Sequence, residues 1–306
     1  MIEARNLTKR YGRYGETLAV NDLSFTVEPG RVTGFLGPNG AGKSTTMRLL
    51  LGLDHPHGGD ATIDGKHYQD LTRPLEVVGA LLEARAVHSG RSAYHHLLCL
   101  AQTQGIGKRR VGEVIDLVGL PSVAGKRAGG FSLGMGQRLG IAAALLGNPR
   151  VLILDEPVNG LDPTGIVWIR TLTKRLASEG RTVFVSSHLM NEMAVTADHL
   201  IVIGRGKLVA DCSTEEFIER ASDQAVLVRS PDAERLGEAI ALEGGKVTPD
   251  GDGVLGVAGM EPARIGELAS AGRFVLHELA PKRSSLEEAF MELTRDSVEY
   301  RAGGAA

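Results

Sequence analysis

Apolar segments of four or five residues recur along the first two thirds of the chain. Residues 32–36, 151–154, 182–185 and 200–203 are apolar almost throughout, and the last three are each followed by a segment with helical periodicity. Strands that are apolar on both faces and alternate with helices are typical of a mostly parallel sheet with helices covering it. The pattern therefore predicts an α/β core.

Two further patterns occur beside these strands. In residues 1–30, β-rich runs alternate with turn residues, which predicts a small antiparallel sheet that lies against the core. Between residues 70 and 147 the spacing of the apolar residues becomes helical. The individual segments are β-rich runs at 18–20 and 23–27 and candidate helices at 94–104, 111–118 and 137–146.

A second region begins near Ser222. Its order of strand, helix, strand, strand, helix and strand is compatible with a small ferredoxin-like α+β unit. The predicted strands are 225–228, 246–248, 254–257 and 274–276, and the predicted helices are 233–242 and 262–271.

A last helix follows this unit. Ser285 and Glu288 have the spacing of a capping box, and one face of the helix carries Leu286, Phe290 and Leu293. We therefore expect a domain at 1–220, with a helical subdomain at about 85–147, and a small accessory domain at 221–306 whose tail, 302–306, is disordered.

Composition and charge narrow the classes of function. The 306 residues are 42% hydrophobic, which suffices for a core in each of two domains. A net charge of −3 gives no electrostatic argument for a nucleic acid or an anionic lipid as partner. Cys99 and Cys212 fit a reducing compartment and are interpreted as buried small residues. The chain start is unlike a signal peptide and the apolar stretches are too short to cross a bilayer, so we expect any membrane role to come from another chain.

A phosphate-binding loop is the strongest chemical signal in the sequence. The pattern G-x-x-x-x-G-K-[ST] is matched, between a buried strand and a helix start, by Gly37-Pro38-Asn39-Gly40-Ala41-Gly42-Lys43-Ser44-Thr45. The glycines let backbone N–H groups point at phosphate oxygens, and the helix N-terminus adds further donors. Lys43 is expected to reach the β- and γ-phosphates, and Ser44 to hold Mg²⁺. The loop therefore predicts a nucleoside triphosphate site.

Two carboxylates follow the apolar run 151–154. A buried strand cannot keep charges inside, so Asp155 and Glu156 are expected at its carboxyl edge, where α/β sheets bind ligands. Asp155 is suited to orient Mg²⁺ through water opposite Ser44. Glu156 is suited to position and polarise an attacking water. The alternative is an acidic helix cap after a core strand, but the phosphate loop upstream favours the catalytic interpretation.

Together these motifs resemble those of the ATP-binding-cassette ATPases. The phosphate loop, the segment 131–138, the carboxylates after 151–154, the segment 159–162 and His188 stand in the order of that family. The resemblance covers roughly residues 1–220 and implies a P-loop NTPase cassette that hydrolyses ATP with Mg²⁺. It also implies that two cassettes pair head to tail around two nucleotides and power a separately encoded transmembrane permease.

The resemblance assigns roles that the residues alone leave open. Ser132 and Gly134 match the signature loop that contacts the γ-phosphate bound by the opposite subunit; by itself, Ser-x-Gly before a helix is an ordinary N-cap and turn. His188 matches the γ-phosphate switch contact, although a lone histidine at a strand end is more often a solvated or capping residue. Asp162 matches a residue that contacts the opposite subunit, and it is also a natural N-cap before Pro163.

Tyr11 and Glu83 complete the expected site. Tyr11 matches the aromatic residue that stacks on adenine, with Tyr14 as a weaker candidate, and either residue could instead serve ordinary packing. Glu83 stands where the family usually has glutamine, in a loop that contacts Mg²⁺-bound water and responds to the permease. A carboxylate there can still accept from metal-bound water, but a charge beside Glu156 could raise its pKa or slow turnover.

The departures from the family pattern favour one branch. Leu133 and Met135 replace the usual glycine and glutamine, and with Glu83 and the appended domain they resemble the branch that serves two-gene exporters of antibiotics and peptides. We therefore expect the ATPase subunit of a drug, antibiotic or peptide exporter, on the cytoplasmic face of the cell membrane and bound to it only through the permease. Three alternatives stay open: an importer ATPase, a nucleotide-gated cassette with little turnover, and a cassette protein that acts on ribosomes or DNA.

Overall fold

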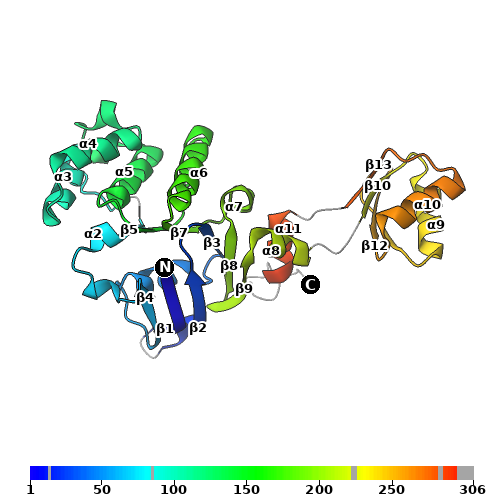
Figure 1. Ribbon diagram of the computed structural model, residues 1–306, viewed down its shortest axis with the longest axis horizontal. Coiled ribbons are helices and arrows are strands. Elements are labelled where there is room, and N and C mark those ends of the chain that lie inside the picture. The colour runs from blue at the N-terminus through cyan, green and yellow to red at the C-terminus, as the bar shows by residue number, and fades with distance from the viewer. Residues whose placement is uncertain (13–14, 84–85, 222–225, 282–284, 295–306) are drawn as a thin grey trace, which may run out of the picture. The chain divides into compact units, whose positions relative to one another are not determined.

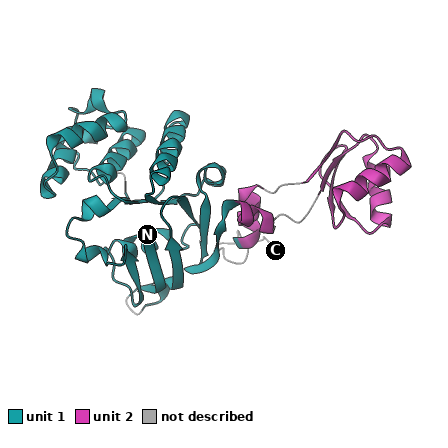
Figure 2. Ribbon diagram, in the orientation of Figure 1, with its two compact units in different colours: residues 1–214, 294–306 teal, residues 215–293 magenta. Residues whose placement is uncertain are grey.

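The computed structural model describes residues 1–12, 15–83, 86–221, 226–281 and 285–294. They belong to two compact units, one formed by Met1–Thr214 together with Thr294, the other by Glu215–Leu293 (Figure 2). The division lies slightly before the expected boundary at 220 and places most of helix α8 (Thr214–Ala221) in the second unit. The expected disordered tail at 302–306 lies outside the described residues.

A six-stranded sheet forms the centre of the first unit (Figure 1). Its order is β5-β6-β7-β3-β8-β9, and all neighbours are parallel except β8 and β9. Because all four apolar segments lie in this sheet, the prediction of a mostly parallel core is confirmed. The strands are β3 (Val32–Leu36), β5 (Val78–Leu81), β6 (Val151–Leu154), β7 (Thr182–Ser186), β8 (His199–Gly204) and β9 (Lys207–Ser213).

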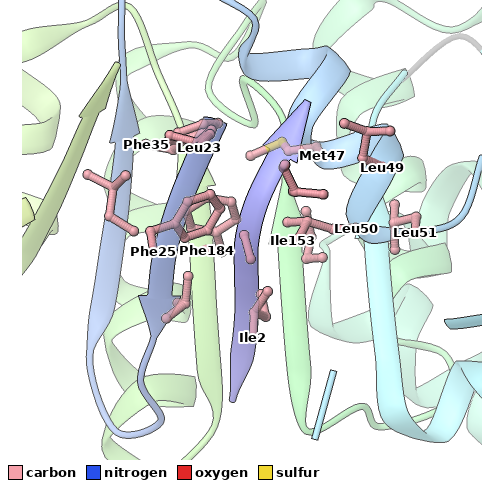
Figure 3. Close-up of a cluster of buried hydrophobic side chains, with 14 of the residues drawn as sticks. Ile2, Leu23, Phe25, Phe35, Met47, Leu49, Leu50, Leu51, Ile153 and Phe184 are labelled. Carbon is pink, nitrogen blue, oxygen red and sulfur yellow. The ribbon is translucent and has the colours of Figure 1, made fainter. Parts of the chain in front are cut away.

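A three-stranded antiparallel sheet in the order β2-β1-β4 lies on the other side of the core from α5 and α6 (Figure 1). It packs through Phe25 of β2, whose ring meets those of Phe35 and Phe184, with centroid distances of 5.8 Å and 5.7 Å (Figure 3). The predicted antiparallel sheet is present, but its two predicted runs are one continuous strand. The strands are β1 (Ile2–Tyr11), β2 (Thr17–Val27) and β4 (Gly58–Ile63).

Helices α1, α6 and α7 follow the core strands β3, β6 and β7, and α3, α4 and α5 lie in the region 85–147 that was predicted to be helical. The signature helix, α5, begins at Leu133 rather than at 137, because the Ser132 hydroxyl accepts a hydrogen bond from the Met135 N–H at 3.3 Å and caps it. Cys99, expected to be buried, is only half-buried on α3, whereas Cys212 is buried. The helices are α1 (Lys43–Leu50), α2 (Pro74–Val77), α3 (Ala93–Thr103), α4 (Lys108–Leu117), α5 (Leu133–Leu145), α6 (Pro163–Ser178) and α7 (Met190–Thr196), with short 3-10 turns at Tyr68–Asp70, Pro121–Val123 and Ala128–Gly130.

The second unit contains a four-stranded sheet in the order β11-β12-β10-β13, with all neighbours antiparallel. The two βαβ segments interleave in this order: β12 lies between β10 and β11, and β10 lies between β12 and β13. This is the ferredoxin-like arrangement that the sequence suggested. The elements are β10 (Val226–Arg229), α9 (Ala233–Leu242), β11 (Lys246–Pro249), β12 (Val254–Ala258), α10 (Pro262–Gly272) and β13 (Glu278–Pro281).

One expectation for this unit is wrong. Residues 274–276 are not a strand: Arg273 ends α10 with a φ of 53°, and Phe274 and Leu276 pack on the apolar core from the loop before β13. On α11 (Leu286–Thr294), Leu293 is 37% exposed and Ala289 takes the buried position. The Ser285 capping box is confirmed, because its N–H donates to Glu288 Oε2 at 2.7 Å and its Oγ accepts from the Glu288 N–H at 3.1 Å.

Within the described ranges, no helix combines the length and the apolar character that a bilayer span requires.

Candidate nucleotide-binding site

The phosphate loop connects the buried end of β3 to α1. Gly40 and Gly42 have φ values of 81° and 103°, in the left-handed region that glycine adopts without strain. A Cβ at Gly37 would lie 2.6 Å from the carbonyl of Ile203, and one at Gly42 would lie 2.3 Å from the carbonyl of Ala19. The glycines are therefore required both by backbone conformation and by the close approach of neighbouring strands.

The Lys43 side chain lies inside this loop. Its Nζ donates to the carbonyl oxygens of Gly37 at 2.5 Å and Pro38 at 3.2 Å, and the residue is buried. Desolvation by this burial lowers the pKa of Lys43, and the negative charges of Glu156 and Asp155 oppose the shift. A buried ammonium group whose hydrogen-bond partners are neutral carbonyls is well placed to bind a phosphate oxygen.

Asp155 accepts hydrogen bonds from two hydroxyl groups. Ser44 Oγ, at the start of α1, donates to Asp155 Oδ2 at 2.7 Å, and Ser186 Oγ, at the end of β7, donates to Asp155 Oδ1 at 2.5 Å. Ser186 is fully buried, whereas Ser44 is exposed. The carboxylate is thus oriented from inside the sheet by Ser186 and faces the phosphate loop through Ser44. These are hard oxygen groups of the kind that Mg²⁺ prefers.

Glu156 is held at its backbone and at its side chain. Its φ is 50°, its N–H donates to Ser186 Oγ at 2.9 Å, and its carbonyl accepts from Gln137 Nε2 at 3.0 Å. Its Oε2 lies 2.7 Å from Nδ1 of His188 and accepts from the His188 N–H at 3.3 Å. The Glu156 carbonyl also accepts from the Asn159 N–H at 3.2 Å. Since a residue with a side chain rarely adopts a positive φ, these three hydrogen bonds hold the backbone of Glu156 in a conformation that is otherwise unfavourable.

Tyr11 lies at the end of β1 and is 38% exposed. Its hydroxyl donates to Asp54 Oδ2 at 2.9 Å, and the same oxygen accepts from Arg48 Nε at 2.7 Å. Tyr14 lies outside the described residues. The Tyr11 ring is therefore tethered at the surface rather than packed in the core, as a residue that stacks on a base requires.

The signature loop and the loop before α6 lie against each other. A Cβ on Gly134 would come 2.8 Å from the carbonyl of Gly160, so that only glycine permits this approach. Ser132 caps α5, and Asp162 caps α6, with Asp162 Oδ1 accepting from the Gly165 N–H at 2.8 Å. The capping interpretation of both residues is confirmed, and both loops remain candidates for contact with a second subunit.

Glu83 follows β5 at the same sheet edge. β5 pairs with β6, and the Asp155 N–H donates to the carbonyl of Leu81 at 2.7 Å. The Glu83 side chain is exposed, and the structure gives it no hydrogen bond to the described part of the chain. The sheet therefore places Glu83 at the same edge as Asp155 and Glu156, but no hydrogen bond links its side chain to them in the described part of the chain.

Three residues of this site were not found from the sequence: Ser186, Gln137 and Asp54. Gln137 and Ser186 are polar residues within apolar elements, at 3% and 0% exposure, and a buried polar side chain in such an element signals a specific partner. Asp54 carries no comparable signal, because it lies in a polar loop.

Family models match both parts of the chain. The model described as ABC transporter matches residues 20–159, and an AAA domain model, described as a putative AbiEii toxin of a Type IV TA system, matches residues 126–194. A model for a domain of unknown function, DUF8746, matches residues 224–287. The ABC transporter match contains the phosphate loop and both carboxylates.

Curated relatives extend this match over the whole chain. The chain is 36% identical over 304 residues, 98% of its length and 97% of the relative's, to the uncharacterized ABC transporter ATP-binding protein YhcH of Bacillus subtilis. The chain belongs to the ABC transporter ATP-binding proteins. This ATP-binding protein is also 41% identical over 223 residues, 72% of its length and 71% of the relative's, to the bacitracin transport ATP-binding protein BcrA of Enterococcus faecalis. It is 36% identical over 211 residues, 69% of its length and 90% of the relative's, to the lantibiotic transport ATP-binding protein SrtF of Streptococcus pyogenes.

Solved structures place the ATP-binding protein among cassette folds. An ATP-binding subunit of an ABC transporter superposes with a TM-score of 0.65 at 25% identity, covering 72% of this chain and 92% of that one. A dimeric ATP-binding cassette, MJ0796, described in a post-hydrolysis state with ADP and Pi, superposes with a TM-score of 0.63 at 25% identity, covering 70% and 99%. The predicted P-loop NTPase cassette fold and the prediction of an ATP-binding subunit are therefore confirmed.

Proposed function

We propose that this ABC transporter ATP-binding protein hydrolyses Mg-ATP as one half of a cassette dimer and thereby powers export through a separately encoded permease. The observation that carries the proposal is the continuous set of hydrogen bonds at the carboxyl edge of the parallel sheet. It joins Ser44, Asp155, Ser186, Glu156 and His188. A helix start, two carboxylates and a histidine thus meet at one point, which is the arrangement that phosphoryl transfer to water needs.

The phosphate loop binds the triphosphate in this proposal. Backbone N–H groups of residues 37–45 hold the phosphate oxygens, and Lys43 moves its ammonium group from the loop carbonyls to the β- and γ-phosphates. Ser44 and Asp155 would hold Mg²⁺, with Glu83 as a further candidate ligand through water, and the bound ion would supply positive charge beside the phosphate oxygens. The 2.7 Å contact between Ser44 Oγ and Asp155 Oδ2 supports this assignment, because it brings the two oxygen atoms close enough to bind the same ion.

Glu156 orients and polarises the attacking water. Its Oε2 is engaged by the ring and the N–H of His188, so Oε1 is the oxygen that we assign to the water. The His188 side chain is about half exposed, and we assign its exposed part to the contact with the γ-phosphate. Because His188 contacts Glu156 directly, the presence of the γ-phosphate is sensed at the residue that performs the hydrolysis.

A second copy completes the site. Ser132 and Gly134 of the second copy supply the N-terminus of α5 to the γ-phosphate, and Asp162 contacts the facing subunit. The likeness to the dimeric cassette MJ0796 supports this arrangement. Tyr11 stacks on the adenine base with its exposed ring.

Export of an antibiotic or peptide is the transport function that the relatives favour. BcrA and SrtF are named for transport of bacitracin and of a lantibiotic, and a third relative, from Burkholderia lata, is named as a Nod factor export ATP-binding protein. We infer a place on the cytoplasmic face of the cell membrane, with the permease as the only membrane contact.

The proposal is tested by light scattering on Glu156→Gln with and without Mg-ATP, beside Lys43→Ala. Glu156→Gln is expected to lose phosphate release and to shift from monomer to dimer on addition of Mg-ATP, because the amide cannot act as a base. Lys43→Ala is expected to lose both phosphate release and the shift. Full turnover of Glu156→Gln would remove Glu156 from its role, and a nucleotide-bound monomer would contradict the shared site.

A further inference from the structure

Tyr11 is held by a cluster of side chains and carbonyls that lies outside the five family motifs. The loop that follows α1 provides Asp54 and His55, and β1 provides Lys9 two residues before Tyr11. Lys9 Nζ donates to the carbonyl of His55 at 2.7 Å and lies over the Tyr11 ring, 5.2 Å from its centroid. The ring is thus bounded at one face by a cation that is itself anchored.

Asp54 is the centre of this cluster. Its Oδ2 accepts from the Tyr11 hydroxyl at 2.9 Å and from Arg48 Nε at 2.7 Å, while Oδ1 accepts from Arg48 Nη2 at 3.4 Å. The Arg48 side chain is about half exposed, whereas that of Asp54 is only 19% exposed. The hydrogen bond from Arg48 lowers the pKa of Asp54, so the carboxylate stays charged and keeps accepting from Tyr11.

The cluster links the two ends of the nucleotide site through one helix. α1 begins at Lys43 in the phosphate loop, carries Arg48 in its last turn and leads directly into the loop of Asp54. An eight-residue α-helix is a rigid rod about 12 Å long. The position of the Tyr11 ring relative to the phosphate loop is therefore set by α1 and Asp54, in addition to the path of β1.

We propose that Asp54, held by Arg48, is a positioning residue for the nucleotide base, because it locks the Tyr11 ring in the orientation in which adenine stacks. The inference rests on the proposed role of Tyr11. Without the tether, an exposed tyrosine at a strand end would have to lose rotamer freedom on each binding event, and preorganisation avoids that cost. Among the described residues, Asp54 makes its side-chain hydrogen bonds to Tyr11 and Arg48 and none to the phosphate loop or the carboxylates, so we expect its effect in base binding.

The test compares binding of Mg-ADP, which carries the base, with binding of Mg-pyrophosphate, which does not. Calorimetric titration of the full chain is made for wild type, Tyr11→Ala, Tyr11→Phe, Asp54→Ala and the double variant Tyr11→Phe/Asp54→Ala. Glu179→Ala is the control, because it also removes a carboxylate that pairs with an arginine, at 2.8 Å from Arg181, but away from Tyr11 in the sequence. Steady-state ATPase rates are measured in parallel.

Asp54→Ala and Tyr11→Phe are each expected to weaken ADP binding by about threefold to tenfold, the size of one net hydrogen bond. The double variant is expected to be no weaker than Tyr11→Phe, because that change already breaks the contact with Asp54. In Asp54→Ala, pyrophosphate affinity and kcat should be unchanged while KM for ATP rises, and Glu179→Ala should behave as wild type.

Two failures are distinguishable. If Tyr11→Ala binds ADP as wild type does, Tyr11 is not the base platform, and this part of the proposed function falls together with the inference. If Tyr11→Ala is weakened but Asp54→Ala is not, or if Asp54→Ala weakens pyrophosphate equally, only the positioning role of Asp54 is overturned.

Discussion

Replacing Ser186 by alanine should slow ATP hydrolysis much more than it weakens ATP binding. The Ser186 hydroxyl donates to Asp155 Oδ1 at 2.5 Å and accepts from the Glu156 N–H at 2.9 Å. It therefore orients the Asp155 carboxylate and the backbone of Glu156 at once, and neither of these two hydrogen bonds involves the phosphate loop. Ser186 is fully buried, so water cannot take its place without a change in packing.

The magnitude follows from the two hydrogen bonds. Loss of a hydrogen bond to a charged carboxylate costs about 1.5–3 kcal/mol, and leaving the Glu156 N–H without a partner costs about 1–3 kcal/mol. Together these losses lower the free energy of unfolding of the nucleotide-free protein by about 2.5–6 kcal/mol. If about 1.4–2.7 kcal/mol of this stabilisation is also lost from the transition state for hydrolysis, kcat falls by about tenfold to a hundredfold.

The assay separates positioning from stability. Phosphate release is measured at saturating Mg-ATP, ATP affinity is measured by titration, and the free energy of unfolding is measured in urea. Thr173→Val is the control, because Thr173 is a buried hydroxyl that donates to the carbonyl of Ile169 on α6, away from the carboxylates. We expect Thr173→Val to lose stability but to keep kcat.

A folded Ser186→Ala protein whose kcat lies within about twofold of wild type would refute the reasoning. So would an equal loss of kcat in Thr173→Val, because the effect would then follow stability and not the contacts of Ser186. A Ser186→Thr protein, which retains the hydroxyl, is expected to recover most of the activity of wild type.

Three other outcomes follow from the structure. Gly37→Ala should abolish ATP binding and lower stability, since its Cβ would lie 2.6 Å from the Ile203 carbonyl, and nucleotide titration with a urea melt checks both. Because burial lowers the pKa of Lys43, the folded state binds fewer protons than the unfolded state between that lowered pKa and 10.5. The free energy of unfolding of the wild-type protein should therefore rise with pH across this window, and a Lys43→Met protein measured in the same buffers should lack that rise. Phe290→Ala should lower the free energy of unfolding by about 3–5 kcal/mol in denaturant titrations, whereas Leu293→Ala should change it by less than about 1 kcal/mol, since Phe290 is 7% and Leu293 is 37% exposed.

Local signals predicted the elements that local chemistry decides. β3 has the predicted bounds because five consecutive buried positions precede a glycine-rich loop. Helix α9 coincides with its predicted range, 233–242, because its apolar residues recur at helical spacing. The capping box at Ser285 needs only residues three apart, so the sequence contains the whole interaction.

Edge strands and loop residues were harder to predict. β5 is four residues long and includes a glycine, and β4 is a polar edge strand, so neither has a periodicity that stands out from a loop. The apolar residues at 274–276 were predicted to form a strand, but Phe274 and Leu276 pack against the core of the second unit from a loop. Burial and strand formation give the same local pattern when the segment is short.

By itself, the sequence determined the chemical identity of the site: a loop that only glycine can form, a lysine and a serine after it, and two carboxylates at the end of a buried strand. The tertiary structure alone decided which of these groups meet. The strand order β5-β6-β7-β3-β8-β9 puts the ends of β3, β6 and β7 side by side, and so joins Ser44 to Asp155 across 111 residues and Ser186 to Asp155 across 31. No local pattern encodes such a contact, because it depends on which strands pair, and pairing is selected by the packing of the whole core. The same holds for Asp54 and Tyr11, whose hydrogen bond spans 43 residues and exists only because α1 returns the chain to the end of β1.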